Sequence, residues 1–369
     1  MLNVSLIADA LRRHALAVNT GYCRDGTTAT FANHYWMDLY GGIRFVAQVH
    51  AGRDVLFPVD VRHQFVGDEA ALLKAVQASK KLPQWLDAEW DHLPVLQALM
   101  MRLSSSRVMV LDASLTNPVA LAGEMNDLVM SSREDAARTQ AKVESQAWQD
   151  AADDGWLAQQ AYISNVAQAA ESFTAVNVCL LETEFAPADK YAAGGMYETS
   201  IQQASNYRRQ LTGDELNGEC KPKPWPRPDA MTVLEHRRAI HAELSVAHFD
   251  AEVLGYIACA KLSRINGLHV DVLLLCEGDC NGIVNTIADQ VGAVWRDITA
   301  DAGFHYVWSP AQCPWVGSIA SSSDAKFSML MRDLELSALA ERYVRPKALA
   351  GTPTFLLGNT PPVAAKEVA

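Results

Sequence analysis

The chain has 369 residues, of which 49% are hydrophobic, with a mean hydropathy of -0.03 and a formal net charge of -12. These values predict a soluble chain with apolar material for two domains. The negative charge argues against a large nonspecific surface for nucleic acid, because phosphate contacts need lysine and arginine. The sequence contains no uncharged apolar run of about 18 residues, so it predicts no membrane span. Asp9, Arg12 and Arg13 interrupt any hydrophobic export signal. We therefore expect a cytoplasmic protein without membrane contact.

Residues 1–170 are expected to form a mixed α/β N-terminal domain without a recognisable chemical motif. Residues 42–50 and 54–61 carry the apolar, β-branched composition of two paired strands. Residues 133–171 show apolar side chains at helical spacing, which predicts one or two helices. The aromatic residues near its start, Tyr22 among them, are interpreted either as core packing or as a surface that stacks on bases. This domain is a candidate for binding a protein partner.

The seven cysteines are scattered along the chain, and their number is odd. In a cytoplasmic chain this pattern favours free thiols over disulfides. No second pair matches the closest two, Cys276 and Cys280, so zinc binding there is not favoured over free thiols.

Residues 171–358 are expected to form a second, α+β domain, followed by a disordered tail at 359–369. Alternating apolar patterns predict strands, and the longer apolar periodicities predict helices. The turn at 263–267 joins two of the strands into a hairpin. The expected strands are 173–182, 251–261, 267–275, 304–308 and 354–357, and the expected helices are 232–247, 283–300 and 324–343.

The strand at 267–275 carries one histidine and one carboxylate among apolar residues. Strand side chains alternate with a period of two, so His269 and Asp271 point to the same face. An imidazole nitrogen and a carboxylate oxygen on a rigid strand are half of a metal site. The alternative is a hydrogen-bonded pair on the sheet surface.

A tyrosine and a group of cations follow about seventy residues later. Tyr343 comes directly after Arg342 and is followed by Arg345 and Lys347. A tyrosine beside cations, downstream of a metal-binding pair, is the arrangement of a nuclease that attacks DNA with a tyrosine hydroxyl. The alternative is that the Tyr343 ring packs into the core.

Several short motifs resemble one family in order and content. They are Val-Leu-Gly-Tyr-Ile at 253–257, Ala-Lys-Leu at 260–262, Gly-Leu-His-Val-Asp-Val-Leu-Leu-Leu at 267–275, the helix ending at Trp295, and 303–308. Together they resemble the C-terminal domain of filamentous-phage (inovirus-type) replication proteins, which also occurs in the prophage-encoded YagK/YfjJ family. The resemblance covers residues 173–358, about half of the chain.

This resemblance implies a rolling-circle replication initiator of the His-hydrophobic-His endonuclease superfamily, with a five-stranded antiparallel sheet flanked by helices. It implies that His269 and Asp271 hold Mg²⁺ or Mn²⁺, and that Tyr343 attacks single-stranded origin DNA to form a 5′-phosphotyrosine. It assigns charge compensation to Lys347, and we expect Arg264, Arg342 and Arg345 to contact DNA.

The sequence departs from the family pattern at two metal-site positions. Asp271 stands where the family has a second histidine, and Ser263 follows Lys261-Leu262 where the family often has a glutamate. Three interpretations therefore stay open: an active DNA nickase, a degenerate relative that binds DNA or a protein partner, and an unrelated interaction protein. Basic side chains on the His269 face favour the first two, whereas a closed, acidic or apolar face favours the third.

Overall fold

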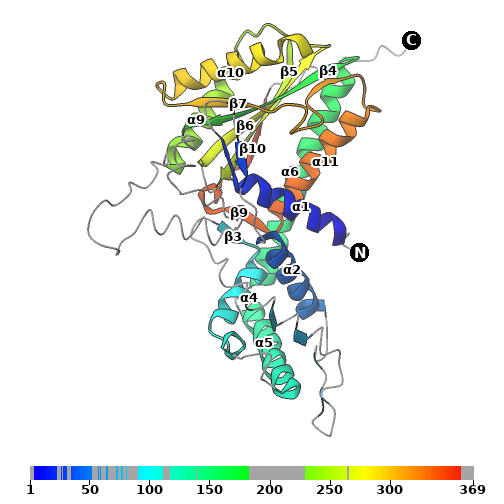
Figure 1. Cartoon of the computed structure of the whole chain (residues 1–369), viewed down its shortest axis with the longest axis vertical. Coiled ribbons are helices and arrows are strands. Elements are labelled where there is room, and N and C mark those ends of the chain that lie inside the picture. The colour runs from blue at the N-terminus through cyan, green and yellow to red at the C-terminus, as the bar shows by residue number, and fades with distance from the viewer. Residues whose placement is uncertain are drawn as a thin grey trace, which may run out of the picture. The chain divides into compact units, whose positions relative to one another are not determined.

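The computed structural model describes most of the chain outside a few segments (Figure 1). The described residues are 4–22, 28–30, 35–51, 90–110, 117–138, 140–182, 229–263 and 266–358, with isolated positions between 26 and 80. Three predictions lie outside these residues. They are Arg264 as a DNA contact, most of the predicted strand at 54–61, and the predicted tail at 359–369.

The chain forms two compact units whose segments alternate along the sequence. Unit 1 comprises Met1–His14, His34–Asp154 and Leu336–Lys347, and unit 2 comprises Ala15–Asn33, Gly155–Glu335 and Ala348–Ala369. The domain boundary predicted at residue 170 falls inside unit 2. Three chain segments thus contribute to each unit, and among the described elements three α-helices and one 3-10 helix run across the divisions.

Unit 1 is helical in its described part. It contains most of α1 (Val4–Val18), α2 (Tyr35–Ala51), α4 (Pro94–Ser104), η2 (Arg107–Met109), α5 (Pro118–Arg138) and the first part of α6 (Ala141–Ala169). Helices α2, α4 and α5 contact one another and bury apolar side chains such as Leu39, Leu96 and Met125. One short antiparallel pair, β3 (Trp90–His92) with β9 (Val344–Pro346), joins the second and third chain segments of this unit.

The prediction of a strand at 42–50 was wrong, because these residues belong to α2. Leu39, Ile43 and Val46 are buried and recur at intervals of four and three residues, which places them along one side of a helix. Burial of that helical face against α4 and α5 outweighs the β propensity of the individual side chains.

Unit 2 is built on an antiparallel sheet whose strands lie in the order β10-β5-β6-β4-β7, with β8 also paired to β4. The strands are β4 (Phe173–Leu181), β5 (Val253–Ser263), β6 (Gly267–Glu277), β7 (Phe304–Val307), β8 (Gly317–Ile319) and β10 (Phe355–Leu357). The hairpin of β5 and β6 is confirmed, and Gly267 has the positive φ of 80° that its turn requires. The long central strand β6 therefore has a neighbour on each side along almost its whole length.

Helices cover both faces of this sheet, which confirms the predicted antiparallel sheet flanked by helices (Figure 1). Val270, Val272 and Leu274 of β6 face α9 (Ala230–Leu244) and α10 (Val284–Ile298). Leu273 and Leu275 face the second part of α6 and α11 (Ala325–Glu341). Because the strand alternates, the odd-numbered His269 and Asp271 share the face of Leu273, beyond the end of that apolar cluster.

A two-stranded ribbon follows α1 in unit 2. Its strands are β1 (Thr20–Tyr22) and β2 (Thr28–Thr30). The backbone N–H of Tyr22 donates to Asn266 Oδ1 at 2.8 Å, and Ser263 Oγ donates to the carbonyl of Thr20 at 2.8 Å. These bonds fix β1 at the β5–β6 turn. Among the described helices, none is both long and apolar enough to span a bilayer.

Candidate functional site

The two predicted metal ligands lie side by side on β6 and are buried. His269 is 3% exposed and Asp271 is 5% exposed. His269 Nε2 lies 3.8 Å from Asp271 Oδ1, so the two functional groups face each other. Both side chains therefore lie on the same face of the sheet, as the alternation along a strand predicts.

A third donor, Cys179 of β4, completes a cluster that sequence reasoning missed. Cys179 stands directly opposite Asp271 in the β4–β6 register and is fully buried. One ligand atom from each of Cys179, His269 and Asp271 lies within 4.8 Å of the others. The sequence gives little sign that Cys179 belongs to this site, because Cys179 lies in a continuous apolar strand. Its position opposite Asp271 depends on the register between β4 and β6.

Hydrogen bonding in the cluster leaves two acceptor atoms, Asp271 Oδ1 and His269 Nε2, facing one another. Lys261 Nζ lies 2.6 Å from Asp271 Oδ2 and neutralises the carboxylate. His269 Nδ1 lies 3.2 Å from the carbonyl oxygen of Gly267. This contact makes Nδ1 the protonated nitrogen and leaves the lone pair on Nε2, toward Asp271. Within the described part of the chain, Asp271 Oδ1 has no hydrogen-bond partner.

Burial and charge set the protonation states of the three groups. Burial alone would raise the pKa of Asp271, but Lys261 and His269 hold that pKa below its ordinary value, so the carboxylate is ionised. Burial lowers the pKa of His269, which keeps the imidazole neutral near pH 7. Burial and the charge of Asp271 raise the pKa of the Cys179 thiol well above its ordinary value. The cluster therefore holds one carboxylate, one neutral imidazole and one protonated thiol.

Aromatic side chains close this face of the sheet. The Tyr22 ring lies 6.0 Å from the His269 ring, 5.2 Å from Tyr306 and 5.8 Å from Trp308, measured between centroids. Tyr22 packs with Cys179 and Tyr306 in one buried cluster. This favours core packing for Tyr22. Lys261, with 41% of its side chain exposed, is the charged residue that connects the cluster to solvent.

The predicted nucleophile and its neighbouring cations belong to unit 1. Tyr343 follows the end of α11, is 2% exposed, and accepts a hydrogen bond on its carbonyl from the Leu93 N–H at 2.8 Å. Burial raises the pKa of its hydroxyl. No single unit therefore contains both Tyr343 and the His269–Asp271 pair.

The nearby arginines are engaged within unit 1. Arg342 donates to both carboxylate oxygens of Asp153, at 2.8 and 3.0 Å. The Arg345 guanidinium stacks on the Trp148 ring at 4.5 Å and donates to the carbonyl of Trp148 at 2.9 Å. Lys347, at the start of η4 (Lys347–Leu349), is exposed.

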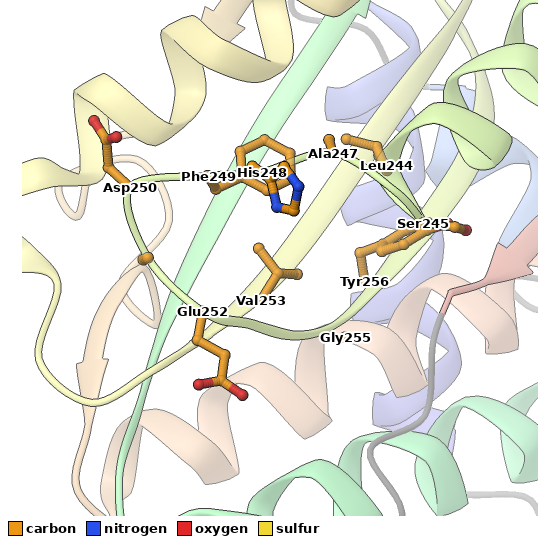
Figure 2. A pocket seen from close by; sticks show the side chains of 11 residues that line it. Leu244, Ser245, Ala247, His248, Phe249, Asp250, Glu252, Val253, Gly255 and Tyr256 are labelled. Carbon is orange, nitrogen blue, oxygen red and sulfur yellow. The ribbon is translucent and has the colours of Figure 1, made fainter.

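A separate pocket of about 380 Å³ lies where α9 leads into β5 (Figure 2). Its hydroxyl groups are used internally, since Ser245 Oγ and the Tyr256 hydroxyl lie 2.7 Å apart. The carboxylates of Asp250 and Glu252 point in different directions and are exposed (Figure 2). The pocket therefore gathers no set of groups that converge on a ligand.

The Cys179–His269–Asp271 cluster is the described site with the clearest chemical capacity. A thiol, an imidazole and a carboxylate are donors of transition-metal sites, whereas Mg²⁺ prefers an octahedron of oxygens and keeps several waters. A single buried carboxylate beside a thiol does not fit Mg²⁺, and it fits Mn²⁺ poorly. In comparisons with known proteins, no family model, no curated protein and no solved structure matches this chain.

Proposed function

We propose that this chain is a catalytically degenerate relative of the rolling-circle replication initiators, which binds single-stranded DNA without cutting it. The single observation that carries the loss of cutting is the contact of Lys261 Nζ with the buried Asp271 carboxylate, at 2.6 Å. On the same face, the Tyr22 ring packs beside His269. A catalytic metal at this position would need a scissile phosphate to reach it. Residues that are 3% and 5% exposed do not offer that access.

The kinship rests on the resemblance, and the place of β6 is consistent with it. The His269–Asp271 pair sits on β6, the middle strand of the path β10-β5-β6-β4-β7, in an antiparallel sheet flanked by helices. That is the sheet which the resemblance implies. DNA is proposed as the partner because it is the substrate that the resemblance implies.

Burial of the tyrosine also supports a protein that does not cut. A nucleophilic hydroxyl must come in line with a phosphorus atom, and its reactivity rises as its pKa falls. Tyr343 is 2% exposed, and burial raises the pKa of its hydroxyl. Both properties oppose attack on DNA.

Fluorescently labelled single-stranded DNA, mixed with the purified chain and Mn²⁺, separates binding from cutting. We expect fluorescence anisotropy to report salt-sensitive binding, and a denaturing gel to show no covalent protein–DNA adduct. An adduct that forms with the unchanged chain and disappears in Tyr343→Phe would overturn the proposal. Absence of binding to a panel of strands would instead favour a protein partner, bound through the N-terminal part of the chain.

An active nickase is the second candidate, and one observation favours it. Lys261 is 41% exposed on its side chain, so it can turn into solvent and release Asp271 as a ligand beside His269. In that case His269 and Asp271 would be available to a divalent cation, and Lys347 would compensate phosphate charge. The same gel decides between the two candidates.

A further inference from the structure

We propose that Cys179, His269 and Asp271 form a binding site for a thiophilic divalent cation of the Zn²⁺ class. This proposal rests on the proposed function, in which the His269–Asp271 face of the sheet does not take part in DNA cutting. Its donors come from two adjacent strands, with Cys179 on β4 opposite Asp271 on β6. Rigid strands hold donor atoms better than loops do.

The donor atoms are close to the separations that a zinc ion requires. Zinc bonds of about 2.0–2.3 Å in a tetrahedral site place neighbouring donors roughly 3.3–3.8 Å apart. His269 Nε2 and Asp271 Oδ1 are already 3.8 Å apart, and all three donor atoms lie within 4.8 Å of one another. Small side-chain rotations therefore suffice to bring the set to bonding distance.

Two features of the cluster point to a cation rather than to simple packing. Asp271 Oδ1 is buried, lacks a hydrogen-bond partner among the described residues, and faces His269 and so into the cluster. A buried carboxylate oxygen without a partner is costly, and a metal bond would relieve that cost. His269 Nδ1 contacts the Gly267 carbonyl, which is the outer hydrogen bond that orients a metal-binding histidine.

Charge balances when the cation replaces Lys261. In the structure, the Lys261 ammonium neutralises the Asp271 carboxylate. When the cation binds, the Cys179 thiol releases its proton to solvent, and two negative ligands match the two positive charges of the metal. Lys261, which is partly exposed, then turns outward. Neither state leaves an uncompensated charge in the sheet.

Titration with Co²⁺, a spectroscopic substitute for Zn²⁺, tests the site on the full chain after dialysis against a chelator. We expect a thiolate-to-cobalt charge-transfer band in the near ultraviolet, which excess Zn²⁺ removes. Cys179→Ser should abolish the band, and His269→Gln should weaken Co²⁺ binding about tenfold or more. Absence of the band in the unchanged chain overturns the proposal, whether or not any variant folds.

Cys259→Ser is the matched control. Cys259 stands opposite Asp271 on the other side, in the β5–β6 register, but does not belong to the cluster. The band should survive this change. A band that persists in Cys179→Ser, or that Cys259→Ser removes, would assign the cation to other thiols, such as Cys276 and Cys280, and overturn the proposal.

The cobalt band is read without DNA, so its outcome is separate from that of the proposed function. A band together with DNA binding supports both proposals. A band without DNA binding supports the metal site and overturns the DNA proposal, whereas DNA binding without a band does the reverse. A covalent DNA adduct would contradict the proposal that the protein does not cut DNA, and with it the metal-site proposal that depends on that function.

Discussion

The two groups of predicted site residues, one in each unit, differ in how their polar atoms are used. In unit 1, Arg342 is paired with Asp153 and Arg345 is stacked on Trp148, while the neighbouring Tyr343 is buried. In unit 2, the β6 cluster keeps a carboxylate oxygen without a partner and a histidine nitrogen that faces it. The side chains of the first group are used for packing, whereas the second group keeps polar atoms that could bind a cation. Substitutions in each group test that difference.

Tyr343→Ala should produce the largest effect. Removing a buried aromatic ring loses its burial and leaves a cavity, so the free energy of unfolding should fall by about 3–5 kcal/mol. Urea denaturation followed by circular dichroism measures this change.

Tyr343→Phe is the control for this packing role. It keeps the ring and removes only the hydroxyl, so its cost should stay within about 1.5 kcal/mol. A severe loss of stability in Tyr343→Phe would mean that the hydroxyl, rather than the ring, holds this turn, and the contrast between the two groups would weaken.

The Lys261–Asp271 pair should behave differently when one partner or both are removed. Lys261→Met leaves a buried carboxylate without its cation and should cost about 1–3 kcal/mol, reduced by the partial exposure of Lys261. The double variant Lys261→Met/Asp271→Leu removes both charges, and buried pairs replaced in this way are often neutral or stabilising. Recovery of stability in the double variant, measured by thermal unfolding, would show that the pair is kept for binding rather than for stability. A double variant that is less stable than the single one would contradict this.

The pH dependence of stability should carry the signature of a histidine buried in its neutral form. Burial lowers the folded-state pKa of His269 below its ordinary value of 6.5. The stability contribution is therefore complete above pH 6.5, and it is lost as the pH falls from 6.5 through the lower folded-state pKa. Thermal unfolding between pH 8 and pH 5, with chelator present, should show a decline that His269→Gln reduces. His241 adds a slope of the same sign, because burial also lowers its pKa. An unchanged slope in His269→Gln would therefore assign the effect elsewhere.

Most of the unit 2 fold was predictable from sequence, because its elements are long and strongly patterned. Strands β4 and β6 have nine and eleven residues of nearly continuous burial, β5 has eleven residues that are mostly buried, and α10 has a well-defined apolar face. The three-residue strands β3, β8 and β9 were not predicted, because a short segment carries too little pattern and pairs only through tertiary contacts. The stretch at 42–50 was misinterpreted because β-branched composition masked a helical period.

The candidate site was predictable only in its local part. The period of a strand places His269 and Asp271 on one face, and sequence alone suffices for that step. Cys179, Lys261 and Tyr22 join the cluster through strand register and through the attachment of β1 by Asn266, which are tertiary facts. Sequence reasoning therefore brought His269 and Asp271 together but did not find the Cys179 thiol beside them.

Arg345→Lys should have the smallest effect, and it sharpens the comparison from the unit 1 side. The Arg345 guanidinium lies 4.5 Å from the Trp148 ring, and a lysine keeps the charge but loses the planar stacking and the bonds to the carbonyls of Trp148 and Glu341. We expect a loss of about 0.5–1 kcal/mol in urea denaturation and no change in affinity for single-stranded DNA. Lys347→Gln at an exposed position is the matched test, because loss of a phosphate contact there would weaken DNA binding and reduce its salt dependence. If Arg345→Lys weakened DNA binding as Lys347→Gln is expected to do, the arginine would have to leave Trp148 in the complex, and unit 1 could no longer be regarded as organised for packing alone.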